Sequence, residues 1–104
     1  MQYYIETTKY GNTKDEVDSM ANQKEKALMK RINELCNEKE MTYYGLSYKS
    51  AVPITTLLHI MDGSTKNPGI FTIMKLCDGL GVTLKEFFDS VMFETAIVED
   101  RDEK

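Results

Sequence analysis

The connection between two short helical segments constrains the fold of this chain more than any other sequence feature. Segment 43–49 follows Thr42, a residue type that suits the N-cap of a helix. Segment 54–61 follows Pro53, whose fixed φ and missing N–H suit a helix start. Since Ser50-Ala51-Val52-Pro53 alone separates them, we predict two helices that pack against each other at an angle set by a tight turn.

Three more helices are predicted around this pair. In segment 24–39, apolar residues recur at spacings of three and four, which is the period of a helix with one buried face. Segment 69–80 ends at Gly81, and segment 84–90 follows Thr83 in a Thr-Leu-Lys-Glu capping box. The sequence therefore predicts five helices within residues 24–90.

The two ends of the chain differ from this helical part. Segment 2–10 is rich in tyrosine and threonine, and a strand over segment 91–98 would place Val91, Phe93, Thr95 and Ile97 on one face, so each segment is expected to be irregular or to form a short strand. Solvated tails, pairing between the two ends and strand exchange across a dimer all remain open. We divide the chain into an N-terminal extension (1–23), a helical domain (24–90) and an acidic C-terminal tail (91–104), a candidate dimerisation segment.

The charge of the chain is distributed unevenly. Its 104 residues, of which 41% are hydrophobic and 29% charged, suffice for one small core, and the formal net charge is −4. Segment 24–88 nevertheless carries nine basic and seven acidic residues, a net charge of +2, so the negative charge lies in the two ends. A mildly basic middle is compatible with a nucleic-acid partner.

Several other classes of protein are not indicated. No apolar run approaches the roughly 18 residues that span a bilayer, and the first residues lack the pattern of a secretory signal. With two cysteines and one histidine, neither a disulfide framework nor a metal site is expected, and no glycine-rich loop suggests a nucleotide cofactor. We expect a cytoplasmic protein that is not an enzyme, has no cofactor and does not enter membranes.

The order of residues in the helical part sharpens this interpretation. The series runs Met41-Thr42-x-x-x-Leu46-Ser47-x-x-Ser50-Ala51-Val52-Pro53-x-x-Thr56-Leu57-x-x-Ile60-x-x-Gly63, then Asn67-Pro68, Leu76 and Leu80-Gly81-Val82-Thr83-Leu84-x-x-Phe87-Phe88. Over about residues 24–90 it resembles the phage-repressor (Cro-type, XRE) helix-turn-helix family. The resemblance implies an all-α, five-helix, lambda-repressor-like DNA-binding domain.

The family resemblance also implies a function and a set of site residues. Members lay the second helix of the motif, here 54–61, in the major groove of duplex DNA and act as transcriptional regulators, often as homodimers on palindromic sites. The base-reading positions fall on Ile54, Thr55 and His59. The phosphate-contacting positions fall on Thr42, Tyr43, Thr56, Lys66 and Asn67. The expected function is a sequence-specific regulator of transcription, a repressor, bound to double-stranded DNA as a homodimer.

The chemistry of the base-reading residues fits this role, although three of the site residues have an alternative. Thr55 exchanges hydrogen bonds with base edges, His59 donates to guanine N7 or O6, and Ile54 packs on a thymine methyl. Equally, His59 suits an ordinary solvent-facing position, Ile54 an apolar contact with a partner, and Lys66 a solvated loop charge.

Departures from the family pattern define a second hypothesis. A buried arginine–glutamate pair that is common in the family falls on Cys36 and Met61, so both ions are replaced by apolar side chains and Cys36 is expected to be a packing residue. Asp62 is expected to repel phosphate. An antitoxin-like or phage-encoded protein-interaction module, which meets its partner through Ile54 and Leu58, is therefore the alternative.

Overall fold

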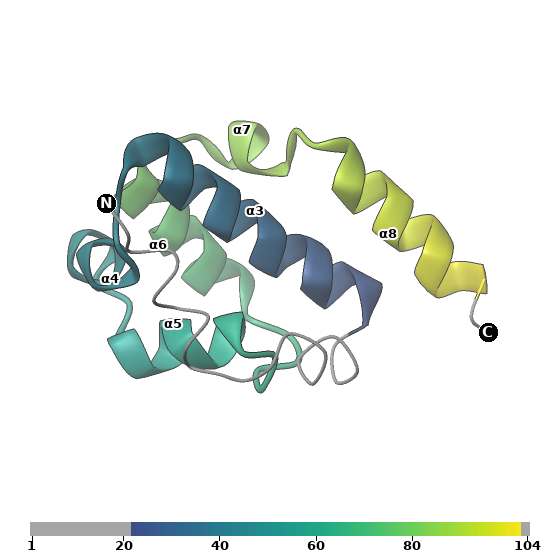
Figure 1. The fold of residues 1–104 in the computed structure, drawn as a ribbon, viewed down its shortest axis with the longest axis horizontal. Coiled ribbons are helices and arrows are strands. Elements are labelled where there is room, and N and C mark those ends of the chain that lie inside the picture. The colour runs from purple at the N-terminus through teal and green to yellow at the C-terminus, as the bar shows by residue number, and fades with distance from the viewer. Residues whose placement is uncertain (1–21, 103–104) are drawn as a thin grey trace.

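The computed structural model describes residues 22–102, and this part of the chain is built of helices without a strand. Figure 1 shows α3 running across the middle of the molecule, with α4 and α5 at one side of it and α8 at the other. The six helices are α3 (Gln23–Lys39), α4 (Tyr43–Ser50), α5 (Ile54–Met61), α6 (Ile70–Leu80), α7 (Leu84–Phe88) and α8 (Val91–Asp102).

Local capping explains where the predicted helices begin. Asn22 Oδ1 accepts the Glu25 N–H at 2.8 Å and Glu25 Oε1 accepts the Asn22 N–H at 3.1 Å, so a capping box opens α3. The box predicted for α7 is confirmed, because Thr83 Oγ1 accepts the Glu86 N–H and Glu86 Oε1 accepts the Thr83 N–H. The hydrogen bonds from Thr83 lower the pKa of the Glu86 carboxyl.

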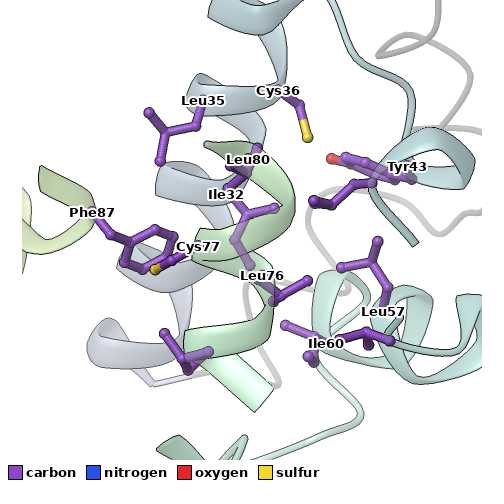
Figure 2. Close-up of a cluster of buried hydrophobic side chains, with 13 residues drawn as sticks. Ile32, Leu35, Cys36, Tyr43, Leu57, Ile60, Leu76, Cys77, Leu80 and Phe87 are labelled. Carbon is purple, nitrogen blue, oxygen red and sulfur yellow. The ribbon is translucent and has the colours of Figure 1, made fainter. Parts of the chain in front are cut away.

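The core is formed where the first five of these helices meet. Its fully buried side chains come from α3 through α7, and Figure 2 shows most of them converging from separate helices. The largest are Phe87, Ile32, Leu46, Leu57, Leu76 and Cys36. Burial of one such aliphatic or aromatic side chain contributes about 1.5–3 kcal/mol. This core fixes α4 and α5 against α6, which leaves the outer faces of α4 and α5 in solvent.

Arg31 ties α7 to α3. Its Nε donates to the Phe87 carbonyl and its second guanidinium nitrogen donates to the Glu86 carbonyl, both at 2.6 Å. The last carbonyls of a helix have no partners within it, so these bonds satisfy the end of α7. The remaining guanidinium nitrogen forms an ion pair with Glu34 at 2.7 Å.

The prediction of a strand over residues 91–98 is wrong, because these residues lie in α8, and the predicted count of five helices becomes six in the described part. Phe93, Ala96 and Asp100 recur at spacings of three and four and form the face of α8 that packs on α3. Ala96 is buried, and the Phe93 ring lies 6.2 Å from that of Phe87. The strand predicted for segment 2–10 lies outside the described residues.

Asp100 fastens α8 to the start of α3. Its two carboxylate oxygens accept the Gln23 and Lys24 N–H groups, each at 3.1 Å, and Lys24 Nζ donates to Oδ2 at 2.8 Å. The positive end of a helix dipole favours a carboxylate at this place. The hydrogen bond from the Lys24 side chain, with those from the two backbone N–H groups, lowers the pKa of Asp100. Residues 91–102 are therefore attached to the fold, whereas the division of the chain at residues 23 and 90 stays a prediction.

Candidate nucleic-acid interface

Side-chain hydrogen bonds fix the turn between α4 and α5. Thr42 Oγ1 accepts the Gly45 N–H at 2.8 Å, as its predicted role as N-cap requires. At the other end of α4, Ser47 Oγ donates to the Val52 carbonyl at 2.6 Å and Ser50 Oγ accepts the Val52 N–H at 3.2 Å. Ala51 turns the chain with a φ of +62°. The orientation of α5 relative to α4 is therefore set by α4 itself.

Helix α5 presents two of the three predicted base-reading side chains to solvent. Leu57 and Ile60 are buried in the core, whereas Thr55 and His59, four residues apart, lie exposed on the opposite face. Ile54 is half-buried and packs against the edge of the core. The prediction of a helix over 54–61 is confirmed, and Thr55 and His59 form its accessible polar face.

The C-terminal end of α5 holds His59 beside a carboxylate. His59 Nδ1 lies 3.9 Å from Asp62 Oδ2. Asp62 Oδ1 accepts both the Ser64 N–H at 2.8 Å and the Ser64 hydroxyl at 2.6 Å. The Thr65 N–H donates to the His59 carbonyl at 3.1 Å, so the segment after α5 folds back onto the helix end. Asp62 is thereby held next to His59.

The residues predicted to contact phosphate occupy different environments. Thr42 and Thr56 are half-buried, with Thr42 also serving as the cap of α4. Lys66 and Asn67 are exposed in the connection between α5 and α6. Thr42 and Lys66 therefore lie at opposite ends of the α4–α5 unit in sequence.

Tyr43 does not lie on the surface that its predicted phosphate contact requires. Its side chain is 4% exposed, packs in the core, and donates its hydroxyl to Asn33 Oδ1 at 2.9 Å. Figure 2 shows the ring directed from α4 toward the core. The first residue of α4 therefore faces α3. Tyr44 and Tyr48, at 59% and 88% exposure, are instead the accessible tyrosines of this helix.

Cys36 is a packing residue, as its sequence position predicts. It is completely buried, and burial raises the pKa of its thiol to about 12. Met61, the position predicted to pair with Cys36 as an apolar residue, is half-buried and packs against the same core. Cys77 is also buried, and burial raises its pKa.

Sequence reasoning missed an apolar surface at the start of α6. Ile70, Phe71 and Met74 are exposed, with Phe71 at 75%. Ile70 also lines a groove of about 650 Å³ whose walls include Leu28, Phe93 and Ile97. The sequence did carry a signal for this surface. Ile70, Phe71 and Met74 do not all share the helix face of the buried residues Ile73, Leu76 and Leu80, so α6 has more apolar residues than its buried face requires.

No helix of the described chain is long and apolar enough to cross a membrane. Residues 22–102 also hold no group of three histidine, cysteine or acidic side chains placed to bind a metal ion.

Comparison with known proteins identifies the family. No curated protein and no solved structure matches the chain. A model of the Cro/C1-type HTH DNA-binding domain matches residues 31–91, more than half of the sequence, from within α3 to the first residue of α8. The match spans α4, the turn and α5 in full. The chain therefore belongs to the Cro/C1-type helix-turn-helix family and is a DNA-binding regulator of transcription.

Proposed function

We propose that this protein is a sequence-specific repressor that lays α5 in the major groove of an operator. The observation that carries the proposal is the division of α5 into a buried face, Leu57 and Ile60, and an exposed face with Thr55 and His59. The major groove, about 12 Å wide, admits one α-helix. A protein bound there blocks the same duplex to other proteins, which is the simplest route to repression.

Three side chains supply the proposed specificity. Thr55 exchanges a hydrogen bond with a base edge, His59 contacts a base one helical turn further along, and Ile54 packs its exposed part on a thymine methyl. A bidentate base contact is worth about 1–3 kcal/mol, and these single contacts are worth less. Specificity is then the sum of several modest terms.

The proposed phosphate contacts come from Thr42, Thr56, Lys66 and Asn67. The three polar side chains donate through hydroxyl or amide groups, and Lys66 adds a positive charge. Tyr43 is left out because its hydroxyl is used inside the protein. These contacts position α5 without reading sequence.

The location of the acidic residues supports DNA binding despite the net negative charge. Helix α8 carries Glu94, Glu99 and Asp100 against Arg101. Figure 1 shows α8 on the other side of α3 from α4 and α5. The acidic residues of α8 therefore lie on a helix other than the one proposed to enter the major groove, and salt screens their repulsion of DNA.

We infer that the protein binds as a homodimer. Because each α5 offers few and modest base contacts, two copies on a palindromic site give the affinity that one copy lacks. Sedimentation of the full chain at micromolar concentration tests this, and a monomer at that concentration contradicts it.

We favour the regulator over the rival interaction-module hypothesis. Ile54 and Leu58 are half-buried and pack against the core, so α5 does not present them as an open apolar face. The polar pair Thr55 and His59 dominates the accessible side of the helix instead.

Selection of bound duplexes from a random DNA pool at about 0.1 M salt tests the proposed function. We expect a palindromic consensus for the full chain and a weaker or altered one for Thr55→Ala and His59→Ala. Thr95→Ala, an exposed threonine on α8, is the matched control and is expected to select the original consensus. Recovery of no consensus by the unaltered chain contradicts the proposal.

A further inference from the structure

We propose that Asp62 is a positioning residue that sets which ring nitrogen of His59 carries the proton, and thereby which bases His59 reads. The inference rests on the proposed function, because it specifies how one of the base-reading residues works. It replaces the expectation that Asp62 merely repels phosphate.

One carboxylate oxygen of Asp62, Oδ2, is placed to act on the His59 ring. Asp62 Oδ1 is engaged by the Ser64 N–H and hydroxyl, which leaves Oδ2 on the side of His59 Nδ1 at 3.9 Å. The side chains of His59 and Asp62 are 59% and 34% exposed. The imidazole therefore has one nitrogen toward the carboxylate while its ring remains accessible to a ligand.

The backbone around Asp62 keeps this arrangement in place. The Asp62 N–H donates to the Leu58 carbonyl at 2.9 Å, and the Thr65 N–H donates to the His59 carbonyl at 3.1 Å. Gly63 is buried and adopts a φ of +85°. Because the chain folds back within six residues and is bonded at both ends, the carboxylate is tied to the same helix end as His59.

The charge of Asp62 selects a tautomer of the neutral ring. A carboxylate accepts and does not donate, so it favours the form with the proton on Nδ1. Nε2 then presents a lone pair to the DNA. A lone pair accepts from the amino groups of adenine N6 or cytosine N4, whereas an Nε2–H donates to guanine N7 or O6. Asp62 thus biases His59 toward bases that carry an amino group in the major groove.

Other charged or titratable groups near this helix are few. Helix α4, which packs against α5, contributes Tyr44, Tyr48 and Lys49, and the segment after α5 contributes Lys66. Among the described residues, Asp62 is the acidic residue with an oxygen within 4 Å of a His59 ring nitrogen. The bias is therefore assigned to Asp62.

The tautomer can be measured without DNA, because His59 is the single histidine of the chain. Long-range ¹H–¹⁵N correlation spectra of the full chain at pH 8 distinguish protonation at Nδ1 from protonation at Nε2. We expect Asp62→Asn to move the tautomer ratio toward Nε2–H by about threefold, the size of effect that an exposed charge pair supplies. The asparagine oxygen still accepts from Ser64, so the loop is expected to persist, which unchanged backbone chemical shifts of residues 63–65 will show.

The control is Asp89→Asn. It makes the same charge change at the exposed end of α7, which Figure 1 places across the molecule from α5. Asp89→Asn is expected to leave the ratio unchanged. A second variant, Ser64→Ala, removes the hydroxyl bond to Oδ1 and retains the carboxylate charge, so it is expected to move the ratio by less than Asp62→Asn. Equal ratios in the unaltered chain and Asp62→Asn overturn the inference.

Selection from the random duplex pool at pH 8 tests the consequence for reading. One position of the consensus is expected to change from adenine or cytosine toward guanine in Asp62→Asn and to stay unchanged in Asp89→Asn. If the unaltered chain yields a consensus that Asp62→Asn reproduces at every position, the inference fails while the proposed function stands. If the unaltered chain yields no consensus, the proposed function fails, and the base-reading inference fails with it even where the tautomer shifts.

Discussion

Gly79 on α6 lies directly against Ser50 on α4. A Cβ atom at Gly79 would stand 2.7 Å from Ser50 Cβ, 2.8 Å from its backbone nitrogen and 2.9 Å from its Cα. Real Cβ atoms do not approach other atoms this closely. The absence of a side chain at Gly79 therefore sets the distance between α6 and the end of α4, from which the turn into α5 begins.

Gly79→Ala is expected to destabilise the fold by about 2 kcal/mol. Overpacking lowers the free energy of unfolding by up to about 3 kcal/mol, and the higher helix propensity of alanine offsets about 1 kcal/mol of this loss. Gly69→Ala is the matched control, since a Cβ there meets no atom within 4 Å. Thermal unfolding by circular dichroism measures both. A stability for Gly79→Ala equal to that of the unaltered chain would contradict the close packing of α4 on α6.

Asp100→Asn is expected to lower the unfolding temperature at pH 7 and to have no effect in acid. The pKa of Asp100 is lowered in the fold, so its stabilisation is fully present above the unfolded-state pKa of about 3.9 and is lost as the pH falls through the folded-state value. Unfolding temperatures from pH 7 to pH 2 test this. Glu99→Gln, at the exposed neighbouring position, should show no such pH dependence of its difference from the unaltered chain.

Tyr43→Phe is expected to cost about 1 kcal/mol of stability through loss of the hydrogen bond to Asn33 and to leave DNA affinity unchanged. Urea unfolding and DNA titration at several salt concentrations measure the two effects. Reduced affinity for all duplexes alike would restore Tyr43 as a phosphate contact.

Lys66→Ala is expected to weaken binding to all duplexes alike and to reduce the slope of log K against log salt by about 1 for each bound copy. Lys85→Ala, an exposed lysine of α7, is the comparison and should retain the original slope. Fluorescence titrations on the selected duplex provide both slopes. A loss of base preference in Lys66→Ala would assign this residue to reading instead of positioning.

Cys36 is expected to resist alkylation by iodoacetamide in the native protein even at pH 9. Its thiol is buried and has a pKa of about 12, so neither access nor thiolate is available. Mass spectrometry should find modification of Cys36 only as denaturant unfolds the chain. Rapid labelling in the absence of denaturant would contradict its role in packing.

The helical part of the fold could be predicted because its signals are local. Caps such as Thr42 and Thr83 and apolar spacings along α3 and α6 specify helix ends and buried faces without knowledge of the tertiary structure. The strand prediction for segment 91–98 failed because Val91, Phe93, Thr95 and Ile97 also fit a strand pattern. The decisive helical set, Phe93, Ala96 and Asp100, becomes visible only when the window extends past Val98.

The candidate site was predicted less evenly than the fold. Position in the motif located Thr55 and His59 on the exposed face of α5. It did not reveal the environment of Tyr43, because whether a tyrosine points to solvent or to α3 depends on the partner at Asn33. The link between Asp62 and His59 likewise depends on how Ser64 and Thr65 fold back, which residue types alone do not specify.

The hydrogen bond between Asp100 and the Gln23 N–H also affects the order of folding. It joins residues 77 positions apart. Nearly the whole described chain must therefore be closed into a loop, at a cost in chain entropy, before this contact can form. The packing of α4 with α5 closes much shorter loops. Attachment of α8 is therefore expected late in folding. Loss of the Asp100 hydrogen bonds should speed unfolding and leave the folding rate almost unchanged.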